Sequence, residues 1–174
     1  MSSAFLKNET ADAPVVIPAR APLPPGTTNY VTPRGLALLR DELNDLETQH
    51  AHIQTDSSEE NDRMRQLALL NGKIGSLNQR IASARVVDPA NQPHDEVRFG
   101  ATVALKTRTG KKAGETRRFT LVGVDEANAS NGLIAFTAPI ARSMQGKRVG
   151  ETITLRTMQG ENEMVITDIT YAGE

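Results

Sequence analysis

Four carboxylates lie close together in the first half of the chain, within the segment QTDSSEEND at residues 54–62. They belong to Asp56, Glu59, Glu60 and Asp62, and no apolar residue separates them. Carboxylate oxygens are the hard ligands that Mg²⁺ takes in proteins, where the ion keeps several of its waters. The segment is therefore either a solvated turn or a set of oxygen ligands held out for a metal ion.

The composition of the chain excludes several other kinds of site. The chain has no cysteine, so disulfides, thiolate metal ligands and cysteine nucleophiles are all absent. Only 3% of the residues are aromatic, which leaves too few rings for a stacking platform that binds single-stranded nucleic acid. The formal net charge of -1 gives no overall attraction to DNA or to an anionic membrane. Since no signal peptide or membrane-spanning run is visible, we expect a soluble cytoplasmic protein.

The residues on either side of the acidic segment predict two helices. Thr32 and Pro33 form a helix start, with Thr32 as the N-cap and proline at the first helical position. Apolar residues then recur every three or four positions in both flanks, which is the pattern of a coiled-coil seam. The first seam comprises Leu36, Leu39, Leu43, Leu46, His50 and Ile53, and the second comprises Leu67, Leu70, Ile74, Leu77, Ile81 and Ala84. We predict an antiparallel coiled-coil hairpin over residues 31–87, with the acidic segment at its tip.

The two predicted arms carry opposite charge. Residues 31–60 hold two basic and seven acidic residues, whereas residues 61–85 hold five basic residues and one acidic residue. Opposite charge on paired helices helps to specify their pairing. A second interpretation places Arg63 and Arg65, which lie beside the tip, near a polyanion.

The rest of the chain divides into a leader and a β-rich part. Residues 1–30 carry five closely spaced prolines and predict a flexible leader. From residue 88 to residue 174, five short β-branched runs are separated by turn residues and predict an antiparallel sheet. The segment PIARSMQGKRVG lies between the third and fourth runs and predicts a short helix that stops at Gly146. The predicted fold class is α+β, with an N-terminal helical hairpin and a C-terminal β domain.

Six segments of the chain are distinctive in their sequence and order: NYVTPRGLALLRDELNDL and RIASARVVD in the hairpin, and VRFGATV, LVGVDEA, APIARSMQGKRVGE and VITDITY in the β-rich part. These segments resemble those of the bacterial transcript cleavage factors GreA and GreB. The likeness runs from Asn29 to Tyr171 and preserves the order and spacing of these segments. It implies an FKBP-like C-terminal domain that docks on the rim of the secondary channel of RNA polymerase, with the hairpin directed toward the active site.

The same resemblance implies a docking surface in the loop after the second predicted strand and in the short helix. Its residues in this chain are Asp125, Glu126, Ala138, Pro139, Ile140, Ala141 and Arg142. The family usually has a serine before the proline, and this chain has Ala138 there. The lost hydroxyl removes a hydrogen bond of the order of 1 kcal/mol from the expected contact.

For the tip, the resemblance implies a part in metal-dependent chemistry. The family has an aspartate, and a glutamate three residues later, in a motif like GDLKENAEY; both help the polymerase to hold a second Mg²⁺ and to position the water that cleaves backtracked RNA. Asp56 and Glu59 reproduce the D-x-x-E spacing and are the expected metal ligands, jointly with polymerase carboxylates. Glu60 and Asn61 reproduce the E-N pair one position late, and Thr55 stands where the family has glycine. We expect no cofactor bound by the chain alone.

The length of the hairpin leaves its role open. Compared with the family pattern it is about a dozen residues short, which at about 1.5 Å per residue along two arms reduces its reach by roughly 9 Å. Stimulation of RNA cleavage and a non-cleaving role at the secondary channel are therefore both possible, and so is a coiled-coil adaptor for another partner. We expect a monomeric accessory factor rather than an enzyme, with RNA polymerase and the 3′ end of nascent RNA as its partners and no membrane contact.

Overall fold

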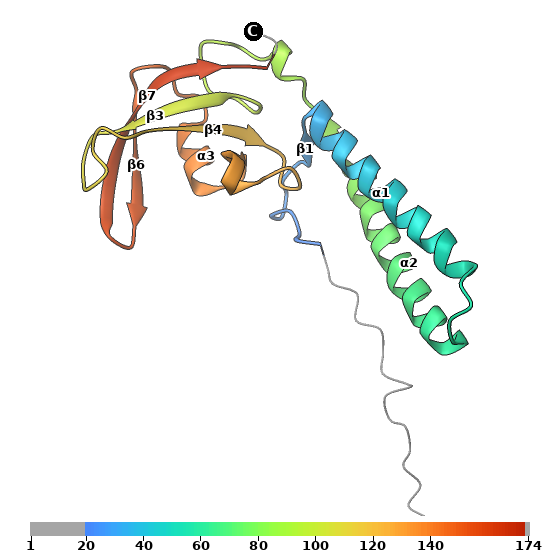
Figure 1. Cartoon of the computed structure of the whole chain (residues 1–174). Helices are drawn as coiled ribbons and strands as arrows, with labels where there is room; N and C mark the ends of the chain where they lie inside the picture. Colours follow the sequence, from blue (N-terminus) through green and yellow to red (C-terminus); the bar gives the residue numbers. More distant parts are fainter. Residues whose placement is uncertain (1–19, 173–174) are drawn as a thin grey trace, which may run out of the picture. The chain divides into compact units, whose positions relative to one another are not determined.

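The computed structural model describes residues 20–172, which form two units (Figure 1). Within these residues, the first unit contains residues 20–22 with Arg40–Ala82, and the second contains Leu23–Leu39 with residues 83–172. These divisions differ from the boundaries at residues 30 and 87 that the composition suggests. They differ because residues just before and just after the hairpin contact the β domain.

Two long helices account for most of the first unit. Helix α1 (Pro33–Gln54, 22 residues) and helix α2 (Glu60–Ser83, 24 residues) are joined by residues 55–59 and run antiparallel (Figure 1). The predicted helical hairpin is thus confirmed. Its seam is the least exposed part of both helices, with Leu70 and Leu77 buried and Leu43, Leu46, His50, Ile53 and Leu67 half-buried. Over the described part of the chain, no helix is long and apolar enough to cross a membrane.

The last residues of the leader contact the hairpin. Arg20 pairs with Glu42 of α1, and Arg80 of α2 donates a hydrogen bond to the carbonyl oxygen of Ala21. Arg80 is only 8% exposed, so this segment covers part of its side chain. The prediction of a flexible leader concerns mainly residues 1–19, which lie outside the described residues.

A five-stranded sheet forms the framework of the second unit. Its strands are β3 (Thr102–Thr107), β4 (Thr116–Val122), β5 (Leu133–Ala135), β6 (Thr152–Thr157) and β7 (Gly160–Thr170), in the order β5-β4-β3-β7-β6. All five predicted strands are confirmed, but β5 lies parallel to β4 and the sheet is not wholly antiparallel. The reason is that β5 pairs with only the last three residues of β4, so a ten-residue connection is enough to bring the chain back.

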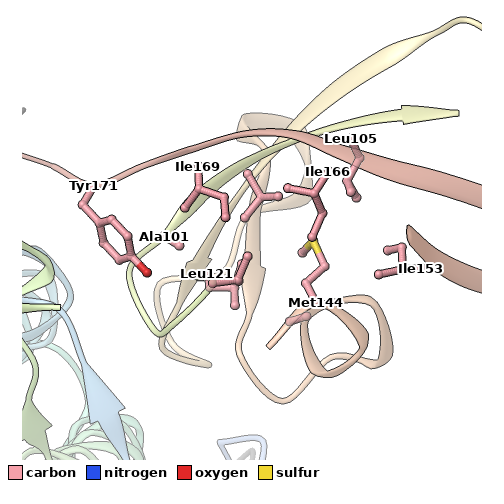
Figure 2. Close-up of a cluster of buried hydrophobic side chains, with 11 residues drawn as sticks. Ala101, Leu105, Leu121, Met144, Ile153, Ile166, Ile169 and Tyr171 are labelled. Atoms are coloured by element: carbon pink, nitrogen blue, oxygen red, sulfur yellow. The ribbon is translucent and has the colours of Figure 1, made fainter. Parts of the chain in front are cut away.

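The core of the second unit lies between this sheet and helix α3 (Pro139–Met144). Leu105, Leu121, Met144 and Ile166 are almost completely buried there, and Tyr171 lies at one end of the cluster (Figure 2). The core is almost entirely aliphatic, as the low aromatic content predicts. Each fully buried leucine, isoleucine or methionine contributes about 2 kcal/mol by leaving water, so α3 is held mainly by its apolar face.

Two short parallel strands in the second unit connect the segment before α1 with the segment after α2. Strand β1 (Tyr30–Val31) pairs with β2 (Arg85–Val86), directly before α1 and directly after α2. The Tyr30 ring lies 6.0 Å from that of Phe99 and 5.7 Å from that of Phe136. Tyr30 therefore belongs to the folded domain, although the composition assigns it to the leader.

Candidate functional site

Backbone hydrogen bonds define the turn that carries the acidic segment. The amide of Asp56 donates to the carbonyl of Ile53 at 3.2 Å, which closes the end of α1. On the other side, the amide of Arg63 donates to the carbonyl of Glu59 at 3.0 Å, which starts α2. Asp56 and Glu59 are thus held at the two ends of one short turn between the helices.

The carboxylates of this turn face solvent while its backbone is held. Asp56, Glu59 and Glu60 are all exposed, and Arg63 donates from Nη1 to the carbonyl oxygen of Asp56 at 3.3 Å. The side chains of Arg63 and Arg65 are half-buried, so their positive charges are only partly exposed to a polyanion. The guanidinium of Arg63 stabilises the turn, and the negative charge of Glu60 is favoured at the positive end of α2.

The tip can supply only part of a metal site. Mg²⁺ takes six oxygen ligands in near-octahedral geometry, whereas Asp56 and Glu59 offer two carboxylates. Among residues 20–172, no three histidine, aspartate or glutamate side chains gather as metal ligands would. The residues present fit a metal ion that a partner also ligates, and the two exposed carboxylates are the groups that would reach it.

In the second unit, Glu126 is directed into the domain. Its carboxylate accepts hydrogen bonds from the Thr32 hydroxyl at 2.6 Å and from Arg34 Nη1 at 3.0 Å, and the residue is 7% exposed. Thr32 Oγ1 also accepts from the amide of Gly35 at 2.9 Å, which confirms the predicted N-cap of α1. Glu126 thus fixes the first turn of α1, and its buried carboxylate is not displayed for a partner.

The parallel pairing of β4 and β5 brings the two parts of the expected docking surface to one edge. Val122 and Ala135, the last residues of the two strands, are paired, so the loop at 123–126 and the segment leading to α3 leave the sheet at the same edge. From the sequence, only the family resemblance indicated that the loop at 123–126 and the start of α3 share one surface. The parallel pairing of β4 with β5 explains why these two segments lie close together.

Only some of the expected docking residues are accessible. Pro139 and Arg142 are exposed, and Asp125 and Ile140 are half-buried. Ala141 is 0% exposed and belongs to the core. A partner at this edge would therefore touch Pro139, Arg142 and the exposed parts of Asp125 and Ile140, while Ala141 supports the helix from below.

Helix α3 begins without a side-chain cap. Ala138 occupies the N-cap position, with extended backbone angles and no side-chain hydrogen bond to the helix. Its carbonyl still accepts from the amide of Arg142 at 2.9 Å. A serine at this position would supply the missing acceptor for an amide of the first turn.

Comparison with known proteins assigns the chain to a family. The family model "Transcription elongation factor, GreA/GreB, C-term" matches residues 92–171. The transcription elongation factor GreA of Ralstonia nicotianae is 33% identical over 160 residues, with 83% of this chain and 99% of that protein covered. The chain belongs to the GreA/GreB family. The α+β fold and the predicted resemblance are thereby confirmed.

Other members of the GreA/GreB family differ in how much of their length is matched. GreA of Nitratiruptor sp. is 35% identical over 105 residues, which is 60% of this chain and 63% of that protein. The chain thus matches about three-fifths of the length of this relative. Among solved structures, GreA/GreB from Nitrosomonas europaea is 21% identical and has a TM-score of 0.41, with 83% of this chain and 99% of that chain covered.

The match with the Ralstonia GreA indicates a shorter chain in the aligned region. It extends over 160 positions but takes in 83% of this chain, which is about 144 residues. About 16 positions of the alignment therefore have no residue in this chain.

Proposed function

We propose that this chain is a transcription elongation factor that binds RNA polymerase at its secondary channel and stimulates the cleavage of backtracked RNA by the polymerase. The main observation behind this proposal is the turn at residues 55–59, in a chain that belongs to the GreA/GreB family. It holds Asp56 and Glu59 by their backbones between two helices and leaves both carboxylates exposed. The chain is then an accessory factor, and the active site belongs to the polymerase.

Docking would use the edge of the sheet where β4 and β5 end. Pro139 gives a rigid exposed surface, and Arg142 gives an exposed charge on the same short helix. Ile140 and Ala141 pack into the core and hold this helix in place. Such an arrangement suits a binding loop, because a rigid base reduces the entropy lost when the partner binds.

At the tip, Asp56 and Glu59 would provide oxygen ligands that complete a site begun by polymerase carboxylates. When bound there, a second Mg²⁺ would supply Lewis-acid chemistry, lowering the pKa of a bound water and stabilising negative charge on the phosphate. Arg63 Nη1 donates a hydrogen bond of 3.3 Å to the carbonyl oxygen of Asp56. This bond holds the backbone of Asp56, which in turn limits the positions that its carboxylate can take. The oxygen of the water would bond to the phosphorus and lose its proton, and the O3′ of the upstream nucleotide would leave and take up a proton; the retained RNA then ends in a 3′-hydroxyl, and the phosphate stays on the 5′ end of the released segment.

A second candidate function follows from the length of the hairpin. Its helices have 22 and 24 residues, and the chain lacks about 16 aligned positions relative to the Ralstonia GreA. If the missing length lies in the hairpin, the tip stops short of the catalytic metal, where an error of even 1 Å is costly. The factor would then occupy the secondary channel and regulate elongation without promoting cleavage.

Two measurements on stalled elongation complexes separate these functions. The intact chain should co-purify with core RNA polymerase, and Pro139→Ala with Arg142→Ala should weaken that binding, while the exposed control Arg156→Ala should not. Added to a backtracked complex with Mg²⁺, the intact chain should accelerate shortening of the RNA. Binding without shortening would select the non-cleaving function, and no binding would leave the adaptor as the remaining candidate.

A further inference from the structure

The hairpin formed by β3 and β4 concentrates positive charge. Six of the 20 lysine and arginine residues of the chain lie within residues 106–118, together with a single acidic residue, Glu115. The six are Lys106, Arg108, Lys111, Lys112, Arg117 and Arg118. All of them are exposed, although the chain as a whole has a net charge of -1. This hairpin therefore carries an excess of positive charge that the chain as a whole does not have.

The loop of this hairpin has a defined conformation. The amide of Gly114 donates to the carbonyl of Thr107 at 2.7 Å, and Gly110 and Gly114 adopt positive φ angles of 84° and 91°. The amide of Arg108 donates to the carbonyl of Glu163 on β7 at 2.8 Å, and the amide of Glu163 donates to Thr109 Oγ1 at 3.0 Å. These bonds fix the loop to the neighbouring strand, so its basic side chains project from a rigid base.

Nearby acidic residues neutralise little of this charge. Arg108 lies 3.9 Å from Glu163 and Arg118 lies 3.5 Å from Asp168, and all four side chains are between 44% and 61% exposed. Exposed ion pairs of this kind contribute little to stability, and their acidic partners can be exchanged for other anions. Within residues 20–172, Lys106, Lys111 and Lys112 form no ion pair. The three lysines, together with Arg108 and Arg118, thus remain available to an external anion.

The pairing of β3 with β4 places two of these charges, those of Lys106 and Arg118, on one side of the sheet, while Arg117 pairs with Leu105 and lies on the other side. Ala104 pairs with Arg118, and Lys106 pairs with Thr116, so Lys106 and Arg118 share the face opposite that of the core residue Leu105. Lys106 and Arg118 are diagonal neighbours on adjacent strands, and such side chains are about 7 to 8 Å apart, which is close to the spacing of successive phosphates on a nucleic acid strand. The lysines of the adjoining loop extend the same charged surface.

We propose that residues 106–118 form a surface that binds the phosphate backbone of a nucleic acid duplex. The segment contains no aromatic and no large aliphatic residue, so it has no means of stacking on bases or of forming an apolar protein interface. Lysine and arginine contacts to phosphates hold a nucleic acid in place without reading its sequence. This surface is separate from the tip and from the docking edge, and the proposal does not depend on the cleavage activity.

The test is the binding of the full chain to a short labelled DNA duplex, measured by fluorescence anisotropy over a range of salt concentrations. Affinity should fall as salt rises, because each phosphate contact releases condensed counterions. Lys111→Gln with Lys112→Gln should weaken binding about tenfold or more at low salt and reduce the slope of log affinity against log salt by about 2. The matched control, Lys147→Gln with Arg148→Gln, removes the same charge elsewhere in the second unit and should leave both quantities nearly unchanged.

Three results would overturn the proposal: no binding of the duplex at low salt, an equal loss of affinity in both double variants, or polyglutamate competing as strongly as DNA. The last result would assign the surface to an acidic protein. Because the substituted lysines are exposed, the thermal unfolding of the variants should match that of the parent chain. Arg118→Gln provides an independent variant on β4, and it should reduce the slope by about 1.

Discussion

Thr32 and Glu126 are 94 residues apart in the chain, and their side chains share a hydrogen bond of 2.6 Å. The same threonine caps α1, and the same carboxylate accepts a second hydrogen bond from Arg34 at 3.0 Å. Because the carboxylate is charged and buried, these bonds are stronger than bonds between neutral groups at the surface. The loop after β4 is thereby joined to the first turn of α1.

Glu126→Ala should destabilise the second unit by about 1 to 3 kcal/mol, because the Thr32 hydroxyl and the Arg34 guanidinium both lose their acceptor. Glu126→Gln keeps one carbonyl acceptor and should cost less. Urea unfolding of the three proteins measures these differences. The control is Glu161→Ala, which removes an exposed carboxylate paired with Arg156 and should change the free energy of unfolding by less than about 1 kcal/mol. Equal losses for Glu126→Ala and Glu161→Ala would contradict the role of Glu126.

Gly35→Ala should destabilise the protein, although alanine is the better helix former. A Cβ atom at this position would lie 2.8 Å from Glu126 Oε2 and 3.3 Å from Thr32 Oγ1, both of which are held by hydrogen bonds. Gly75→Ala on α2 is the matched control, because a Cβ there meets no atom within 4 Å. It should stabilise the helix by up to about 1 kcal/mol. Thermal unfolding compares the two, and a stabilised Gly35→Ala variant would refute the close packing at Glu126.

The sequence predicts the main elements because their apolar residues have a period. Residues of the hairpin seam such as Leu70 and Leu77 are the buried ones, and the five β-branched runs all form strands. The pair β1 and β2 escapes prediction because strands of two residues have no period to detect. The parallel placement of β5 also has no local signal, since it depends on where a ten-residue connection returns.

Ala138→Ser should stabilise α3 by about 1 kcal/mol, because a hydroxyl at the N-cap can accept from a free amide in the first turn. For a domain of this size that gain raises Tm by roughly 4 to 8 °C. Differential scanning calorimetry measures the shift. Ala127→Ser, at an exposed position outside any helix or strand, is the control and should leave Tm nearly unchanged. If the two variants behave alike, the missing cap does not limit the stability of α3.

Tyr171 should make stability fall at high pH. Burial is the main cause that raises the pKa of this phenol above its ordinary value of 10.0. The hydroxyl donates to the carbonyl of Glu96 at 2.6 Å and accepts from the amide of Arg98 at 2.9 Å. Because the folded state keeps its proton to a higher pH than the unfolded state, the stabilisation is complete below about pH 10 and is lost as pH rises through the folded pKa.

Tyr171→Phe isolates this contribution. The variant should be less stable at neutral pH by about 1 to 3 kcal/mol, because the Glu96 carbonyl and the Arg98 amide lose their partner. Its free energy of unfolding should also decline less steeply than that of the parent between about pH 9 and pH 11. Urea unfolding at several pH values gives both quantities. Parallel pH profiles for the two proteins would show that Tyr171 does not titrate in the folded state as described.

Only part of the candidate site could be predicted from the sequence. The exposed carboxylates of Asp56 and Glu59 follow from their position between two periodic seams. The inward orientation of Glu126 does not, because its partners Thr32 and Arg34 are more than 90 residues away. The burial of Ala141 could be anticipated, since it shares the face of α3 with Met144, three positions later, and both are 0% exposed.

The shortening of RNA in a backtracked elongation complex tests the proposed function most directly. The chain and its variants are added with Mg²⁺ at concentrations where each binds the polymerase equally, and the rate of RNA shortening is measured. The intact chain should accelerate shortening, Asp56→Ala with Glu59→Ala should abolish the acceleration, and Asp62→Ala, which removes an exposed carboxylate on α2, should retain most of it. Acceleration that survives the loss of both Asp56 and Glu59 would contradict the account.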